Sequence, residues 1–234
     1  CNEMICHPES QINEEFAYLS LNKVFTLTTK ELGQFISGEI RLPKKSILLT
    51  IDDGARAEKF IPFLEKYKVN ATLFLVSSWY PKETFSSTYL ELASHTHDMH
   101  TNGVCSGGQG GGIRCLSEDL IQADLKNSRE TLNNTEAFCY PFYEYNDYAI
   151  EQVKKAGFKL AFIGGNKMVT KDTNPYLIPR YVIYKNTSLN YCKNLLSEII
   201  QKLYKKKFLY CSTKNYLISD LPQIIVTKRL KLLK

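Results

Sequence analysis

The sequence has few of the features that would place it in a special class. Its 234 residues include no internal repeat and no apolar run near the ~20 residues that a bilayer-spanning helix needs. Its seven cysteines include no Cys-x-x-Cys pair and do not follow the spacing of a small disulfide scaffold. These absences exclude a membrane-spanning helix, a repeat protein and a small disulfide-held domain. Because 44% of the residues are hydrophobic, we expect one globular enzyme domain with a sizeable core.

Excess charge is concentrated at one end of the chain. Residues 205–234 hold eight Lys or Arg against Asp220 alone, a net charge of +7, so residues 1–204 carry −1. We therefore expect a catalytic domain over residues 1–204 that does not bind nucleic acid or other polyanions. Residues 205–234 are interpreted as a basic C-terminal tail of unknown role. Contact of this tail with anionic cell-wall polymers or lipid headgroups remains an alternative.

Histidine is scarce, and three of the four histidines lie together in the segment His95-Thr96-His97-Asp98-Met99-His100. A second polar group, Asp52-Asp53, ends the apolar run of residues 46–51. Two adjacent carboxylates in a desolvated site repel each other unless a cation or proton intervenes. One aspartate and two imidazoles would hold a divalent metal with open positions, leaving the other aspartate as a base. The spacing alone does not rank the three histidines. The alternative is a helix-capping aspartate beside surface histidines.

Short apolar segments alternate with helical patterns along the chain. Strands are predicted at residues 3–6, 24–27, 46–51, 71–76, 92–94, 137–140, 160–163 and 178–183. Helices are predicted at residues 57–67, 117–132 and 146–156. This alternation is typical of a parallel sheet whose functional site lies at the carboxyl ends of the strands. The two aspartates, His95 and Tyr140 all fall at such ends.

Residues 103–112 form a glycine-rich segment directly after His100. A phosphate-binding loop would need a preceding strand, a following helix and a lysine, so we expect a mobile surface loop that flanks the site. Cys105 and Cys115 flank this loop and could form a disulfide in an extracellular protein. A Cys6–His7 nucleophile is disfavoured because adjacent strand residues point to opposite faces.

Three motifs resemble signatures of the polysaccharide deacetylase family. Residues 50–54, Thr-Ile-Asp-Asp-Gly, resemble its Thr-Phe-Asp-Asp-Gly motif, and residues 94–100 resemble its metal-binding motif. Residues 138–146 resemble a third motif, usually written with Tyr-Pro-Tyr-Gly. The resemblance covers about residues 3–185 and is closest to the surface deacetylases of poly-β-1,6-N-acetylglucosamine, in which two metal histidines are five apart and a histidine lies near the N-terminus.

The resemblance implies a fold and a set of roles. The fold would be α/β, a distorted (β/α) barrel with fewer than eight strands in a permuted deacetylase domain. Asp52 would be the general base and His7 the general acid. The metal ligands would be Asp53, His95 and His100. The cofactor would be a divalent metal, with zinc favoured and cobalt, nickel or iron as alternatives.

The third motif and the segment at residues 175–180 supply the implied substrate-binding residues, which are Tyr140, Pro141, Phe142, Tyr143 and Arg180. Arg180 is also a candidate partner of the Asp52 carboxylate. The chain departs from the family pattern at Ile51, which keeps an apolar strand residue, and at Tyr143, which stands where the family has glycine. A bulky side chain at Tyr143 could narrow or reshape the substrate groove.

The implied activity is metal-dependent removal of N-acetyl groups from a cell-surface N-acetylglucosamine polymer, with poly-β-1,6-N-acetylglucosamine favoured. The alternatives are a peptidoglycan or chitin-oligomer deacetylase, or a degenerate carbohydrate-binding protein without turnover. We expect an extracellular or cell-surface location, for which any signal peptide is removed or not included, since the sequence begins at Cys1.

Overall fold

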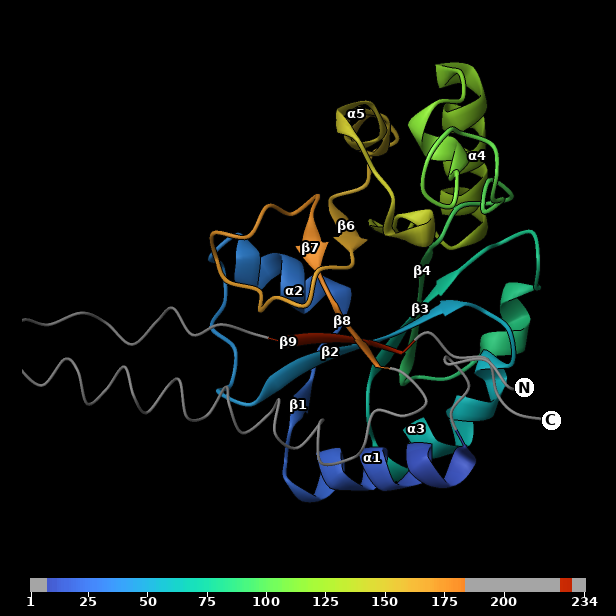
Figure 1. Ribbon diagram of the computed structural model, residues 1–234. Helices are drawn as coiled ribbons and strands as arrows, with labels where there is room; N and C mark the ends of the chain where they lie inside the picture. The colour runs from blue at the N-terminus through green and yellow to red at the C-terminus, as the bar shows by residue number, and fades with distance from the viewer. Residues whose placement is uncertain (1–7, 184–223, 229–234) are drawn as a thin grey trace, which may run out of the picture.

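A single parallel sheet organises the protein, and helices cover it. The structure, a computed structural model, describes residues 8–183 and 224–228. The helices are α1 (Glu9–Leu21), α2 (Thr29–Ile36), α3 (Ile61–Tyr67), α4 (Glu118–Thr131) and α5 (Asp147–Lys155). The strands are β1 (Phe25–Thr26), β2 (Ser46–Asp53), β3 (Ala71–Leu75), β4 (Leu90–Ser94), β5 (Ala137–Cys139), β6 (Leu160–Ile163), β7 (Ile178–Pro179), β8 (Tyr181–Ile183) and β9 (Ile224–Lys228). Figure 1 shows α1 and α3 side by side, with α4 and α5 at the other end of the sheet.

The sheet is an incomplete barrel. Its strand order is β7-β6-β5-β4-β3-β2-β9-β8, with β1 beside β2, and every pairing in it is parallel. Seven strands are three residues or longer. The expected α/β fold, a distorted barrel with fewer than eight strands, is therefore confirmed when the two-residue strands β1 and β7 are left out of the count. The ends of the strand path, β7 and β8, are consecutive in the chain and separated only by Arg180.

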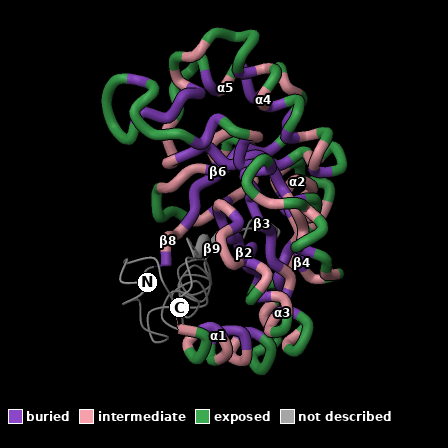
Figure 2. The backbone as a smooth tube through the Cα atoms, turned by 90° about the vertical axis from the view of Figure 1, so that its right-hand side faces the viewer, coloured by how far each residue is buried: buried purple, intermediate pink, exposed green. Residues whose placement is uncertain are grey.

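Alternation along β2 separates two parts of the core. Ile47, Leu49 and Ile51 belong to a cluster that includes side chains of α1 and α3. Leu48 belongs instead to a cluster that includes side chains of α2. Because neighbouring strand residues point to opposite faces, Asp52 shares the face of Leu48 and lies inside the barrel. Figure 2 shows β2 and β3 as buried, whereas exposed residues lie mainly in helices and loops.

Most predicted elements are present, with some differences. Residues 57–67 begin as a 3₁₀ turn, Ala57–Phe60, before α3, and the strand predicted at residues 178–183 is divided at Arg180. Helices α1 and α2 were not predicted. Strand β9 falls in the segment predicted as a C-terminal tail. The domain limit at residue 204 stays a prediction. The strand predicted at residues 3–6 lies outside the described residues. Within the described ranges, no helix has both the length and the apolar character to cross a membrane.

Candidate active site

The two adjacent aspartates lie at the carboxyl end of β2, where the backbone leaves the extended conformation. Asp53 has φ of 74° and Gly54 has φ of 112°. This change of conformation interrupts the alternation of the strand, so that Asp53 can turn toward the same end of the barrel as Asp52. A Cβ atom on Gly54 would lie 2.5 Å from Leu75 Cδ1. Residue 54 must therefore be glycine on both conformational and steric grounds.

His95 and His100 meet Asp53 across the end of the sheet. Strand β3 lies between β2 and β4, with Asp53 beside Leu75 and Leu75 beside Ser94, the residue before His95. Asp53 Oδ1 lies 3.4 Å from the Nε2 atom of each histidine. His97 is not part of this group, and its Nδ1 lies 2.9 Å from Ser77 Oγ instead. The structure therefore brings together the three residues predicted as metal ligands.

The chemistry of this group fits a divalent metal. His95 Nδ1 lies 2.8 Å from the carbonyl oxygen of Cys139, a contact that orients the ring as partners of metal-binding histidines do. His95 Nε2 is buried and makes no hydrogen bond within the described residues. Two ligands at ~2.0–2.1 Å from a tetrahedral ion lie roughly 3.4 Å apart. The distances from Asp53 Oδ1 to His95 Nε2 and His100 Nε2, both 3.4 Å, match this value.

The electrostatic surroundings of His95 are also consistent with a cation. Burial by itself lowers the pKa of His95, but the neighbouring Cys139 and Asp53 outweigh burial and raise this pKa well above its ordinary value. The neighbours therefore favour positive charge at the position of the imidazole. A bound divalent cation would supply that charge while leaving the ring neutral as a ligand.

The loop that carries the histidines is held by Asp124 of α4, which sequence reasoning missed. The Asp124 carboxylate accepts hydrogen bonds from the backbone N–H groups of His97, Asp98 and Met99 at 2.7–2.8 Å. Burial raises the pKa of Asp124, whereas these three donors act in the opposite direction. A lone acid on a helix gives no local signal of this role. Asp124 thus fixes the backbone between His95 and His100, the two histidines of the metal-ligand group.

Asp52 forms a buried ion pair with Arg180. The two guanidinium Nη atoms donate to the two carboxylate oxygens at 2.8 and 3.0 Å. Both side chains are almost fully buried, with exposures of 1% for Asp52 and 0% for Arg180. Arg180 also donates to Thr50 Oγ1 and to Cys139 Sγ. Such a bidentate pair keeps the carboxylate in one orientation, within 4.8 Å of a ring nitrogen of His95.

Residues of the third motif, 138–146, lie partly in the core and partly beside the candidate active site. Tyr140 and Pro141 are buried, and Tyr140 packs in the core cluster beside α4 and α5. The Tyr140 ring has no exposed face, so its side chain contacts other core residues, and the substrate-binding role expected for Tyr140 stays a prediction. Phe142 is partly exposed, and its ring centroid lies 4.5 Å from that of His100. Phe142 and Tyr143 both have left-handed backbone conformations, with φ of 57° and 61°.

Tyr143 turns toward the barrel and covers Arg180. The guanidinium carbon lies 5.0 Å from the centroid of the Tyr143 ring and 5.3 Å from that of Phe74. The buried guanidinium of Arg180 thus contacts the aromatic rings of Tyr143 and Phe74. This arrangement shows what the Tyr143 side chain contacts at the position where the resembled motif is written with glycine. The ring also lines a cavity of about 450 Å³ with Tyr145 and Lys167.

The left-handed conformation of Tyr143 leads to a test by paired variants. Tyr143→Ala and Tyr143→Gly both remove the ring above Arg180, but only glycine adopts φ of 61° without strain. We expect Tyr143→Gly to be more stable than Tyr143→Ala by about 1 kcal/mol. Denaturant unfolding of both variants measures this difference. Equal free energies of unfolding would show that the backbone relaxes away from the left-handed region.

The glycine-rich loop is tied down at several points. Cys105 and Cys115 form a disulfide, the pairing that the sequence left open. Glu144 accepts hydrogen bonds from the backbone N–H groups of Gln109 and Gly111, and it pairs with Arg114. These contacts connect the loop to the segment that follows β5. The loop predicted as mobile is therefore fastened beside the site.

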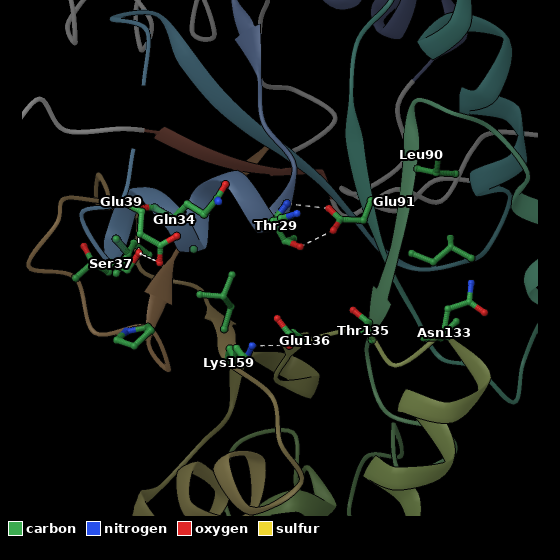
Figure 3. A pocket seen from close by; sticks show the side chains of 18 of the residues that line it. Thr29, Gln34, Ser37, Glu39, Leu90, Glu91, Asn133, Thr135, Glu136 and Lys159 are labelled. Carbon is green, nitrogen blue, oxygen red and sulfur yellow. Dashed lines mark hydrogen bonds and ion pairs between the residues drawn. The ribbon is translucent and has the colours of Figure 1, made fainter. Parts of the chain in front are cut away.

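A larger cavity, of about 1180 Å³, lies away from the aspartates and histidines. Figure 3 shows it near the amino ends of the strands, with Glu91 on β4 and Thr29 on α2. Its polar groups bond to one another: Thr29 donates to Glu91, and Lys159 pairs with Glu136. We therefore place the chemistry at the opposite, carboxyl end, where the metal-ligand candidates are. His7, the predicted general acid, lies outside the described residues.

The comparisons with known proteins agree with this placement. The sequence model of the family described as "Polysaccharide deacetylase" matches residues 39–161, a range that contains both aspartates and all three clustered histidines. The chain belongs to the polysaccharide deacetylase family. A poly-β-1,6-N-acetyl-D-glucosamine N-deacetylase from Staphylococcus aureus is 29% identical over 197 residues, which span 75% of this chain and 67% of that protein.

Solved structures support the fold. The Streptococcus pyogenes deacetylase PplD, solved with acetate, superposes with a TM-score of 0.68 at 19% identity and covers 83% of this chain and 89% of its own. IcaB from Ammonifex degensii gives a TM-score of 0.64 at 22% identity, covering 79% and 88% of the two chains. The seven parallel strands curled into a half-barrel are thus typical of this family's catalytic domain.

Proposed function

We propose that the protein is a metal-dependent N-deacetylase of an N-acetylglucosamine polymer, with poly-β-1,6-N-acetylglucosamine as the favoured substrate. The observation that carries this proposal is the meeting of Asp53, His95 and His100 beside the ion-paired Asp52. Membership of the polysaccharide deacetylase family supports the reaction class, and the Staphylococcus aureus relative supports the choice of polymer.

The proposed metal site would use Asp53 Oδ1 and the Nε2 atoms of His95 and His100. A divalent ion held there would polarise the acetamide carbonyl and lower the pKa of a bound water to ~7. Zinc suits this set of one oxygen and two nitrogen ligands, and cobalt, nickel and iron are alternatives.

The remaining steps belong to groups of the chain itself. Asp52, oriented by Arg180, accepts the proton of the attacking water, and the oxygen attacks the acetyl carbon. The backbone N–H of Phe142 donates a hydrogen bond to the oxygen that gains negative charge. His7 then gives a proton to the departing amine as the C–N bond breaks, yielding acetate and a glucosamine unit. The roles of Phe142 and His7 rest on similarity to the family motifs.

An extracellular or cell-surface location is part of the proposal. A polymer of N-acetylglucosamine at the cell surface is reached only outside the cytoplasm. The Cys105–Cys115 disulfide supports this location, because disulfides persist in oxidising compartments.

The proposal is tested by measuring acetate release from several acetylated glycans. We expect release from poly-β-1,6-N-acetylglucosamine, loss of release after exhaustive chelation, and recovery when zinc, cobalt or nickel is added back. Chitin oligomers and peptidoglycan serve as comparison substrates. Full activity after chelation would reject the metal. Release only from a comparison substrate would reject the favoured polymer, and no release from any glycan would reject the deacetylase assignment.

A further inference from the structure

The sequence contains a single tryptophan, Trp79, and the structure places it beside the site. Its ring centroid lies 5.4 Å from that of His100, and the rings meet edge to face at 72°. The ring of Phe142 lies 4.5 Å from the same histidine. An aromatic side chain thus stands on each of two loops around one metal-ligand candidate. Trp79 nevertheless keeps 45% of its surface exposed.

The backbone that carries the exposed ring is held by several hydrogen bonds. The segment after β3 bonds to the histidine loop through Ser77 N–H to the Thr96 carbonyl at 3.2 Å and Ser78 N–H to the His97 carbonyl at 3.0 Å. The Ser78 side chain also donates to Asp98 at 3.0 Å. Trp79 N–H closes a turn onto the Val76 carbonyl. The backbone that carries Trp79 is therefore fastened to the loop that carries His100.

An exposed indole ring on a well-held backbone next to a reactive centre is suited to binding a flat apolar surface. A large rigid aromatic ring binds with little loss of conformational entropy, and its face matches the C–H face of a pyranose ring. Scattered exposed apolar residues are common and need no explanation. The combination of rigid attachment, exposure and contact with His100 separates Trp79 from that background.

We propose that Trp79 forms a sugar-binding subsite that receives a pyranose ring next to the one that loses its acetyl group. This inference rests on the proposed function. Trp79 is then a specificity-determining residue that favours a chain of sugars over a single sugar. The subsite contributes to the binding of oligomers and takes no part in the hydrolytic step.

The test combines binding and kinetics on the full chain. Because Trp79 is the only tryptophan, its fluorescence reports this subsite directly. After chelation to prevent turnover, a pentamer of β-1,6-linked N-acetylglucosamine should change the emission with saturation, whereas the monomer should not at equal sugar concentration. In metal-loaded enzyme, Trp79→Ala should raise KM for the pentamer about tenfold with kcat little changed. Trp79→Phe should recover part of the loss.

Phe25→Ala provides a matched control. Phe25 is 38% exposed, and it pairs with Ser46 at the amino end of β2, opposite the site. This variant should leave the KM for the pentamer unchanged. Saturable fluorescence change without acetate release would support the subsite while rejecting the proposed function. Acetate release together with unchanged emission and an unchanged KM in Trp79→Ala would overturn the subsite and leave the function standing.

Discussion

Replacing Asp53 with Asn is expected to remove the proposed divalent metal and, with it, the deacetylase activity. Asp53 is the only carboxylate in the group it forms with His95 and His100, and its Oδ1 lies 3.4 Å from both imidazoles. A neutral amide is a poor ligand and leaves the charge of the ion uncompensated. Loss of a supporting group around a metal typically lowers affinity 10–100-fold, so loss of a ligand should lower it by about 100-fold or more. Metal content after dialysis and acetate release measure the two effects.

Asp98→Asn is the matched control for this change. Asp98 lies in the same loop as the histidines and accepts a hydrogen bond from Ser78, but it is not in the metal-ligand group. The substitution removes the same charge close to the site. We expect it to retain metal. If both variants kept one ion per chain, Asp53 would not be a ligand.

Asp52→Asn is expected to keep the metal and lose turnover. The amide retains the shape of the side chain but cannot accept the proton of water, so kcat should fall by ~10²–10⁴. The same change leaves Arg180 as a buried cation without its anionic partner, and breaking such a pair costs about 3–5 kcal/mol. A lower melting temperature should therefore accompany the kinetic loss. Metal content, kcat and thermal unfolding of one preparation separate these effects.

Thr50→Val tests whether disturbance of Arg180 alone explains the loss. Thr50 Oγ1 accepts a hydrogen bond from the same guanidinium at 3.2 Å, and the substitution leaves the carboxylate in place. This variant should be mildly destabilised and remain active. Normal kcat in Asp52→Asn, or loss of metal from it, would contradict the separation of base and ligand.

The central residues of the site could be predicted from the sequence because their signals are local. Asp52-Asp53-Gly54 ends an apolar strand, and the paired histidines lie in one short segment. The parallel order of β2, β3 and β4 then brings these segments together. The sequence did not rank the histidines by spacing, whereas the structure separates His97 through its contact with Ser77.

The residues around the site were harder to predict because their partners are distant in the chain. Asp124 acts on backbone groups 25–27 residues away, and Cys139 contacts an arginine 41 residues away. No periodicity reports such contacts. Helix α2 did have a signal, since Thr28 and Glu31 form a capping box at its start. Strand β9 was missed because its residues stand among many basic ones.

The position of Arg180 between β7 and β8 makes the placement of the two end strands and the orientation of the proposed base interdependent. This residue separates the strands at the two ends of the sheet, and its guanidinium reaches inward to Asp52. Any movement that parts β7 from β6 would pull the cation away from the carboxylate. The fold itself therefore sets the orientation of the proposed base: a displaced β7–β8 segment would also displace the guanidinium that holds the Asp52 carboxylate.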